Sequence, residues 1–178
     1  MPLAAVVPLR DFSLAKVRLR SSGVVDVTTL ARGLAAGVLT ACRGLATFVV
    51  TESDDVEAFA NEHGVRVLRS DVHSLNGAVH FAYERLADAY DQLMIVHGDL
   101  KFPAGLDGFA TVEDVTVVTD DQGDGTNVLV LPTGYDFRFA YGTNSAERHA
   151  REAIRLGLSV SLISDSPWRY DVDEATDL

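Results

Sequence analysis

The chain has 178 residues, 47% of them hydrophobic and 23% charged, which is the balance of a folded globular domain and excludes a disordered or fibrous protein. Its formal net charge of −11 at pH 7 excludes a broad basic surface, so we expect no nucleic-acid and no membrane partner. A single cysteine, Cys42, excludes an internal disulfide and a cysteine-based zinc site. Because no apolar run approaches the roughly 20 residues of a membrane span, we expect a cytoplasmic protein.

Short apolar runs alternate with amphipathic stretches along the whole chain. The expected strands are Leu3–Val7, Ala46–Thr51, Val65–Leu68, Gln92–His97, Asp114–Val118, Asn127–Leu131 and Leu158–Ile163. The expected helices are Thr28–Cys42, Asp54–His63, Asn76–Tyr90 and Ser145–Leu156. This alternation predicts one α/β domain over residues 1–178, with a mostly parallel sheet covered by helices on both faces.

Polar residues and glycines mark the ends of these helices. Thr28 and Ser53 are placed to cap the first two helices, because a hydroxyl there accepts a hydrogen bond from the first turn. Gly64 and Gly157 each lie between a helix and a strand, where a left-handed residue is favoured. Cys42 has apolar neighbours on its helix, and we expect it to belong to the core.

Ligands of open parallel sheets bind beyond the carboxyl ends of the strands, so we expect the functional residues in the loops at that end. The loop after the first strand holds four cations within eleven residues, Arg10, Lys16, Arg18 and Arg20. Arginine and lysine suit phosphate oxygens, although a solvated surface loop is the alternative. No glycine-rich Walker loop is present, which argues against that mode of phosphate binding.

Carboxylates occupy two later strand ends. Asp99 follows the strand Gln92–His97, and Asp171 and Asp173 alternate near the end of the chain, so that in an extended segment they would share one face. Mg²⁺ prefers carboxylate oxygens together with substrate phosphates and water. The alternatives are a turn capped by Asp99 and an acidic tail without function.

Two segments of small residues complete the set of candidates. Gly123–Asn127 suits either a hairpin turn or a close approach to a ligand, because glycine allows positive φ. Tyr141–Ser145 precedes a helix whose N-terminus is either capped by Asn144 or Ser145 or receives an anion. His149, one turn into that helix, is expected to be structural, and His97 beside Asp99 is the other histidine of interest.

Signatures of covalent catalysis are lacking: there is no nucleophile elbow, no HExxH sequence and no cysteine–histidine pairing. A basic first loop and carboxylates at strand ends instead favour phosphoryl or nucleotidyl transfer, in which positioning and charge neutralisation do most of the catalysis.

The order of these segments resembles a known family, the guanylyltransferases of deazaflavin coenzyme F-420 biosynthesis. The matching segments, in chain order, are Val7-Pro8-Leu9-Arg10, Ala15-Lys16-Val17-Arg18-Leu19, Leu75-Asn76, Asp99-Leu100-Lys101, Gly125-Thr126-Asn127, Tyr141-Gly142-Thr143-Asn144-Ser145 with His149, and Asp171-Val172-Asp173. Each motif is short, but together, and in the same order, the motifs span essentially the whole chain.

The resemblance implies a three-layer Rossmann-like nucleotidyltransferase fold of the nucleotide-diphospho-sugar transferase type. It implies GTP as donor, Mg²⁺ as cofactor and a small phosphorylated acid as acceptor: 2-phospho-L-lactate, phosphoenolpyruvate or 3-phospho-D-glycerate. The implied roles are GTP binding by Arg10, Lys16, Arg18 and Asn76, catalysis by Lys16, Arg18 and Asp99, metal binding by Asp99, Asp171 and Asp173, and acceptor binding by Thr126, Gly142 and Ser145. The oligomeric state is left open, with a homodimer as one option.

Four positions depart from the family pattern: Arg10 stands for lysine, Val17 for serine, Lys101 for proline and Asp124 for glycine in many members. They leave two alternatives open. One is a related nucleotidyltransferase with another donor or acceptor, against which the missing N-terminal glycine-rich loop argues. The other is a degenerate nucleotide-binding protein without catalysis, which Arg10 and Lys101 would permit.

Overall fold

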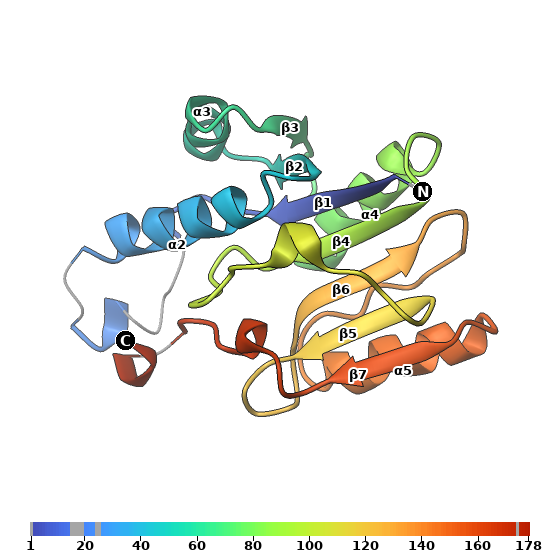
Figure 1. Cartoon of the computed structure of the whole chain (residues 1–178). Helices are drawn as coiled ribbons and strands as arrows, with labels where there is room; N and C mark the ends of the chain where they lie inside the picture. Colours follow the sequence, from blue (N-terminus) through green and yellow to red (C-terminus); the bar gives the residue numbers. More distant parts are fainter. Residues whose placement is uncertain (1, 15–19, 24–25, 174) are drawn as a thin grey trace.

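A computed structural model describes residues 2–14, 20–23, 26–173 and 175–178 of the chain, and these residues are built around a seven-stranded sheet (Figure 1). The strands are β1 (Leu3–Pro8), β2 (Ala46–Thr51), β3 (Arg66–Arg69), β4 (Gln92–Val96), β5 (Val115–Thr119), β6 (Thr126–Pro132) and β7 (Val160–Ile163). Their order is β3-β2-β1-β4-β6-β5-β7, and only β6 runs antiparallel to its neighbours. The predicted mostly parallel sheet is confirmed.

Helices cover both faces of this sheet (Figure 1). The α-helices are α2 (Val27–Ala41), α3 (Asp54–Glu62), α4 (Leu75–Leu86) and α5 (Ser145–Arg155), and short 3-10 helices follow at η1 (Leu106–Gly108), η2 (Pro167–Arg169) and η3 (Ala175–Asp177). One apolar cluster joins α2 and α3 to one face of the sheet, and a second joins α4 and α5 to the other. The fold therefore has the three layers that the resemblance implies.

The strand β4 shows why the sequence produces this arrangement. Leu93, Met94, Ile95 and Val96 are all fully buried, and alternate side chains enter opposite clusters, since Met94 and Val96 pack with α2 whereas Leu93 and Ile95 pack with α4. A strand that is apolar throughout is covered on both sides. Cys42 is also buried, as predicted, and burial raises the pKa of its thiol to about 12.

The helix N-caps confirm one expectation and correct another. The Ser53 hydroxyl accepts from the backbone N–H of Val56 at the start of α3, as predicted. Thr28 was expected to cap α2, but this is wrong: the cap is Asp26, whose carboxylate accepts from the N–H of Thr29 at 3.1 Å. An aspartate at the N-cap also interacts favourably with the helix dipole.

Glycines allow the left-handed turns between helices and strands. Gly64 follows α3 with φ 68°, and Gly157 follows α5 with φ 74°, as expected. The segment Gly123–Asn127 begins as the turn of an antiparallel hairpin between β5 and β6, and the Asp120 carboxylate holds it by accepting from the N–H groups of Asp124 and Gly125, both at 2.8 Å.

No helix in the described part of the chain is long and apolar enough to cross a membrane.

Candidate active site

The last segment of the chain returns to the end of β4 (Figure 1). Leu100 and Asp171 form an antiparallel bridge, the N–H of Val172 donates to the carbonyl of Asp99 at 3.2 Å, and the N–H of Lys101 donates to the carbonyl of Tyr170 at 2.8 Å. This pairing brings together carboxylates that lie far apart in the sequence.

Asp99, Asp171 and Asp173 form a carboxylate cluster in which one oxygen of each lies within 4.8 Å of the others. Burial, followed by the charges of Asp99 and Asp173, raises the pKa of Asp171 to about 7. Three carboxylates held this close repel one another, and a bound cation would relieve that repulsion. An all-oxygen donor set fits a hard ion such as Mg²⁺ rather than a soft one.

Asn127 anchors this cluster from β6. Its amide nitrogen donates to Asp171 Oδ1 at 3.3 Å and to the backbone carbonyls of Trp168 and Arg169 at 3.1 and 3.0 Å. The side chain is buried. It therefore ties the sheet to η2 and to one carboxylate of the cluster. The sequence pattern alone assigns Asn127 no role, although a polar residue inside an otherwise apolar strand is a signal of one.

A cleft of about 560 Å³ opens beside the cluster, over the carboxyl ends of β1 and β4. Arg10, His97, Asp99 and Asp173 all line it, so a cation of the first loop faces the same space as two carboxylates. The remaining lining residues are Pro8, Leu9, Phe12, Leu14, Ala31, His73, Ser74, Leu75 and Gly98. Lys16 and Arg18, predicted to be catalytic and to bind GTP, lie outside the described residues.

Backbone and side-chain bonds fix the start of the loop that carries Arg10. The N–H of Leu9 donates to the carbonyl of Val50 at 3.1 Å. The Asp11 carboxylate accepts from the N–H of Ser13 at 2.9 Å and from the Ser53 hydroxyl at 2.8 Å. Hydrogen bonds from Ser13 and Ser53 lower the pKa of Asp11. The loop is thus attached to the cap of α3 immediately after Arg10.

Asn76, predicted to contact guanosine, has another partner. Its amide oxygen accepts from the N–H of Tyr141 at 2.7 Å, and its amide nitrogen donates to the carbonyl of Tyr141 at 3.3 Å. The side chain thereby joins α4 to the segment before α5, and Asn76 is not among the residues that line the cleft.

Among the residues that the structure describes, the predicted acceptor residues Thr126 and Ser145 form hydrogen bonds with each other and with His149, and none with the carboxylate cluster. Thr126 and Ser145 are buried, and the Ser145 hydroxyl donates to Thr126 Oγ1 at 3.1 Å. Thr126 Oγ1 also forms a hydrogen bond with His149 Nδ1 at 3.0 Å, while His149 Nε2 accepts from the N–H of Ala140 at 3.0 Å. His149 is therefore structural, as expected. Gly142 is exposed, with φ 114°.

The departures from the family pattern also have defined positions. The Lys101 ammonium donates to the backbone carbonyls of Asp177 and Leu178, at 2.5 and 3.4 Å, and so holds the end of the chain. The Asp124 carboxylate accepts from the N–H of Asn144 at 3.1 Å, which links the hairpin to the start of α5. Val17 lies outside the described residues.

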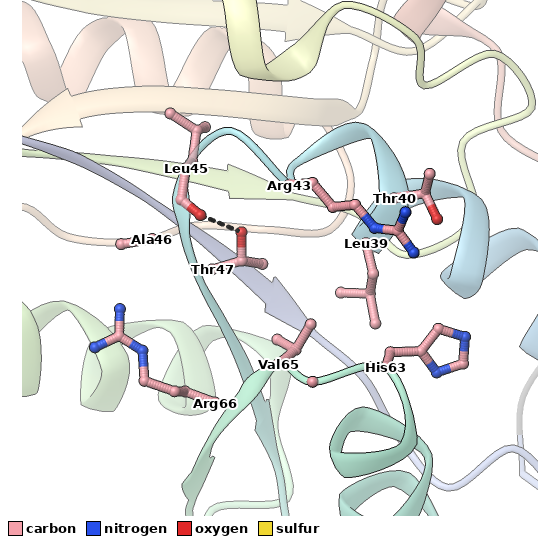
Figure 2. Close-up of a pocket in the computed structure, with 10 residues that line it drawn as sticks. Leu39, Thr40, Arg43, Leu45, Ala46, Thr47, His63, Val65 and Arg66 are labelled. Carbon is pink, nitrogen blue, oxygen red and sulfur yellow. Dashed lines mark hydrogen bonds between the residues drawn. The ribbon is translucent and has the colours of Figure 1, made fainter.

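A second hollow, of about 220 Å³, lies at the opposite end of the sheet, where β2 and β3 begin (Figure 2). Its lining includes Arg43, His63 and Arg66 but no carboxylate. Figure 2 shows the Arg43 and Arg66 side chains on different sides of this hollow, pointing away from each other. They do not converge on a ligand position, so the large cleft is the better candidate.

The fold is the one found in solved nucleotidyltransferases. Two solved structures share the fold, and each covers 94% of its own chain and 99% of this one. A nucleotidyl transferase from Methanothermobacter thermautotroptrophicus matches with a TM-score of 0.70 at 17% identity. The 4-diphosphocytidyl-2C-methyl-D-erythritol synthase of Anaerococcus prevotii matches with a TM-score of 0.68 at 7% identity.

The chain belongs to the guanylyl transferase CofC-like family, whose sequence profile matches residues 3–178. It is 31% identical to a phosphoenolpyruvate guanylyltransferase of Chloroflexus aurantiacus over 97% of this chain and 90% of the relative. It is 28% identical to a 3-phospho-D-glycerate guanylyltransferase of Phenylobacterium zucineum over 73% of this chain and 63% of the relative. The predicted family and enzyme class are confirmed.

Proposed function

We propose that this protein transfers a guanylyl group from GTP to a phosphorylated three-carbon acid and releases pyrophosphate. The observation that carries the proposal is the cleft in which Arg10 faces Asp99 and Asp173 of the carboxylate cluster. Family membership supports the guanylyl group. Two relatives at 31% and 30% identity are named phosphoenolpyruvate guanylyltransferases, so phosphoenolpyruvate is the first acceptor to test. 3-Phospho-D-glycerate and 2-phospho-L-lactate follow.

The reaction balances without a covalent enzyme intermediate. A phosphate oxygen of the acceptor attacks the α-phosphorus of GTP and forms a new P–O bond. The bond between the α-phosphorus and its bridging oxygen to the β-phosphate breaks, and pyrophosphate leaves. Both substrates are anions, so the protein must hold like charges together in line. Most of the catalytic effect then comes from positioning and charge compensation.

Asp99, Asp171 and Asp173 would hold Mg²⁺, because they form a compact all-oxygen donor set. When bound, the ion supplies charge neutralisation at the phosphate oxygens. Arg10, with Lys16 and Arg18, would bind the triphosphate. Since Arg10 is exposed at the cleft, its guanidinium can form paired hydrogen bonds to phosphate oxygens.

The acceptor would be recognised near the start of α5, as the family pattern implies. Gly142 is exposed, and its backbone is accessible to a ligand. Thr126 and Ser145 lie beneath the surface and would support the site through the hydrogen bonds they share. Ser145 N–H donates to the Gly142 carbonyl at 3.1 Å, so these positions are structurally coupled.

The test is pyrophosphate release by the purified protein with Mg²⁺, GTP and each of the three acids, with ATP and CTP as control donors. Mass spectrometry of the product would identify the guanosine diphospho-acid. Turnover with GTP and one acid supports the proposal. Silence with all three acids would overturn it, and turnover that prefers ATP or CTP would assign the chain to a related nucleotidyltransferase.

A further inference from the structure

Glu52 lies one residue beyond β2, at the same edge of the sheet as the cleft. Its side chain is half-buried and lines a recess with Val50, Val72 and Ala78. The recess continues the large cleft, because the two share six lining residues: Pro8, Leu9, Arg10, His73, Ser74 and Leu75. A ligand bound beside the carboxylate cluster can therefore extend toward Glu52.

Glu52 differs from the other carboxylates that surround it. Asp54 and Glu57 both pair with Arg69, at 2.9 and 3.0 Å, and Asp11 accepts from Ser13 and Ser53. Within the described residues, Glu52 forms no hydrogen bond and no ion pair. Its carboxylate is therefore available to a ligand.

A carboxylate in a cleft that binds a polyanion repels the phosphates unless it faces another part of the nucleotide. The sheet order places β1 between β4 and β2, so the end of β2 lies two strand spacings, or about 10 Å, from the end of β4. That separation places Glu52 toward the nucleoside end of a nucleotide whose phosphates lie at Asp99. The apolar side chains of Leu9, Val72 and Leu75 suit the faces of a planar base.

We infer that Glu52 determines the donor base by accepting hydrogen bonds from N1–H and the 2-amino group of guanine, an inference that rests on the proposed function. An ionised carboxylate is an acceptor only, and guanine presents two adjacent donors on this edge. Adenine presents a lone pair at N1 in the same place, so a carboxylate there would meet an acceptor and reject ATP.

The test compares wild type with Glu52→Gln for binding of GTP, ITP, XTP and 2′-deoxy-GTP, by calorimetry with Mg²⁺ and without any acid. Wild type is expected to bind GTP about 10-fold tighter than ITP, which lacks the 2-amino group. Glu52→Gln is expected to weaken GTP binding by about 10- to 100-fold and to improve XTP binding, because the amide can donate to the 2-carbonyl of xanthine.

Glu57→Gln is the matched control, since it changes a nearby carboxylate that is paired with Arg69; it should leave nucleotide preference unchanged. Equal GTP affinity in Glu52→Gln and wild type would overturn the inference. The inference would also be overturned if Glu52→Gln lost the same affinity for GTP and ITP, and if wild type but not the variant discriminated against 2′-deoxy-GTP. That pair of results would assign Glu52 to the ribose. Because no acid is present, base selectivity is measured even if guanylyl transfer fails.

Discussion

The amide nitrogen of Asn127 donates to Asp171 Oδ1 across 3.3 Å, while the backbone of Asp171 forms an antiparallel bridge with Leu100, in the loop that follows β4. One buried amide on the antiparallel strand β6 thus orients a carboxylate that is supplied by the end of the chain. When a hydrogen bond from a second residue already orients a metal-binding carboxylate, that side chain loses less conformational entropy on binding the ion.

Asn127→Ala should therefore raise the Mg²⁺ requirement of the enzyme in addition to lowering its folding stability. We expect the Mg²⁺ concentration for half-maximal activity to rise by about 10-fold, the lower end of typical effects of residues that orient metal ligands. Loss of the buried amide should also cost about 1–3 kcal/mol of unfolding free energy. A Mg²⁺ titration of the initial rate and a urea unfolding curve measure the two effects.

Thr133→Ala is the control for that experiment. The Thr133 hydroxyl follows β6 at its other end and donates to the carbonyl of Tyr90 at 2.6 Å. Its loss should lower stability without changing the Mg²⁺ requirement. An unchanged Mg²⁺ requirement in Asn127→Ala would show that the amide only stabilises the fold.

Asp99→Asn should remove most of the activity and leave the fold intact. The substitution takes one charge from the carboxylate cluster, and we expect kcat/KM to fall by at least about 100-fold. Mg²⁺ should also cease to raise the thermal unfolding midpoint, because an ion stabilises only the state that binds it. Asp165→Asn, a change at an exposed position, should behave like wild type. A near-wild-type rate in Asp99→Asn would exclude Asp99 from metal binding.

Arg10→Ala should raise KM for GTP with little change in the Mg²⁺ requirement. A charge-assisted hydrogen bond to phosphate contributes about 1.5–3 kcal/mol, which corresponds to an increase of about 10- to 100-fold. Arg10→Lys, which restores the residue of the family pattern, should recover most of the affinity. Steady-state kinetics with GTP as the varied substrate distinguish these variants, and an unchanged KM in Arg10→Ala would contradict a role in triphosphate binding.

The periodicity of apolar residues predicted the elements of the fold, because the spacing of these residues in each strand and helix follows the faces that are buried. The run Leu93–Val96 is apolar and is covered on both faces, as the pattern indicated. The helix cap at Asp26 was missed because two neighbouring polar residues compete for the position and only the backbone decides between them. Such local errors did not affect the topology.

The site was predicted less completely, because side-chain partners that are distant in sequence leave no local pattern. Alternation of Asp171 and Asp173 predicted a shared face, and the cluster with Asp99 agrees with that expectation. The hydrogen bonds of Asn76 to Tyr141 and of Ser145 to Thr126 join separate elements. A motif match alone could not show that these side chains bind other residues of the protein instead of pointing toward a ligand.

His149 should make folding stability depend on pH below neutrality. The ring is fully buried, and its Nε2 accepts from the N–H of Ala140, so the folded state requires the neutral form. Burial, followed by the charges of His97 and Arg148, lowers the pKa of His149 from an ordinary value of 6.5 to about 4. The unfolded chain then binds a proton between pH 6.5 and 4 that the folded chain does not, so this contribution to stability is complete above pH 6.5 and is lost as the pH falls.

Urea unfolding of wild type and His149→Gln at pH 7.5 and pH 5 isolates the contribution of this residue. The free energy of unfolding of wild type should fall by about 2 kcal/mol more than that of the variant, because the other titrating groups are common to both proteins. Glutamine keeps one donor and one acceptor for Thr126 and Ala140 without titrating. Equal losses in the two proteins would show that His149 binds a proton in the folded state, and its hydrogen bond from Ala140 would then have to break.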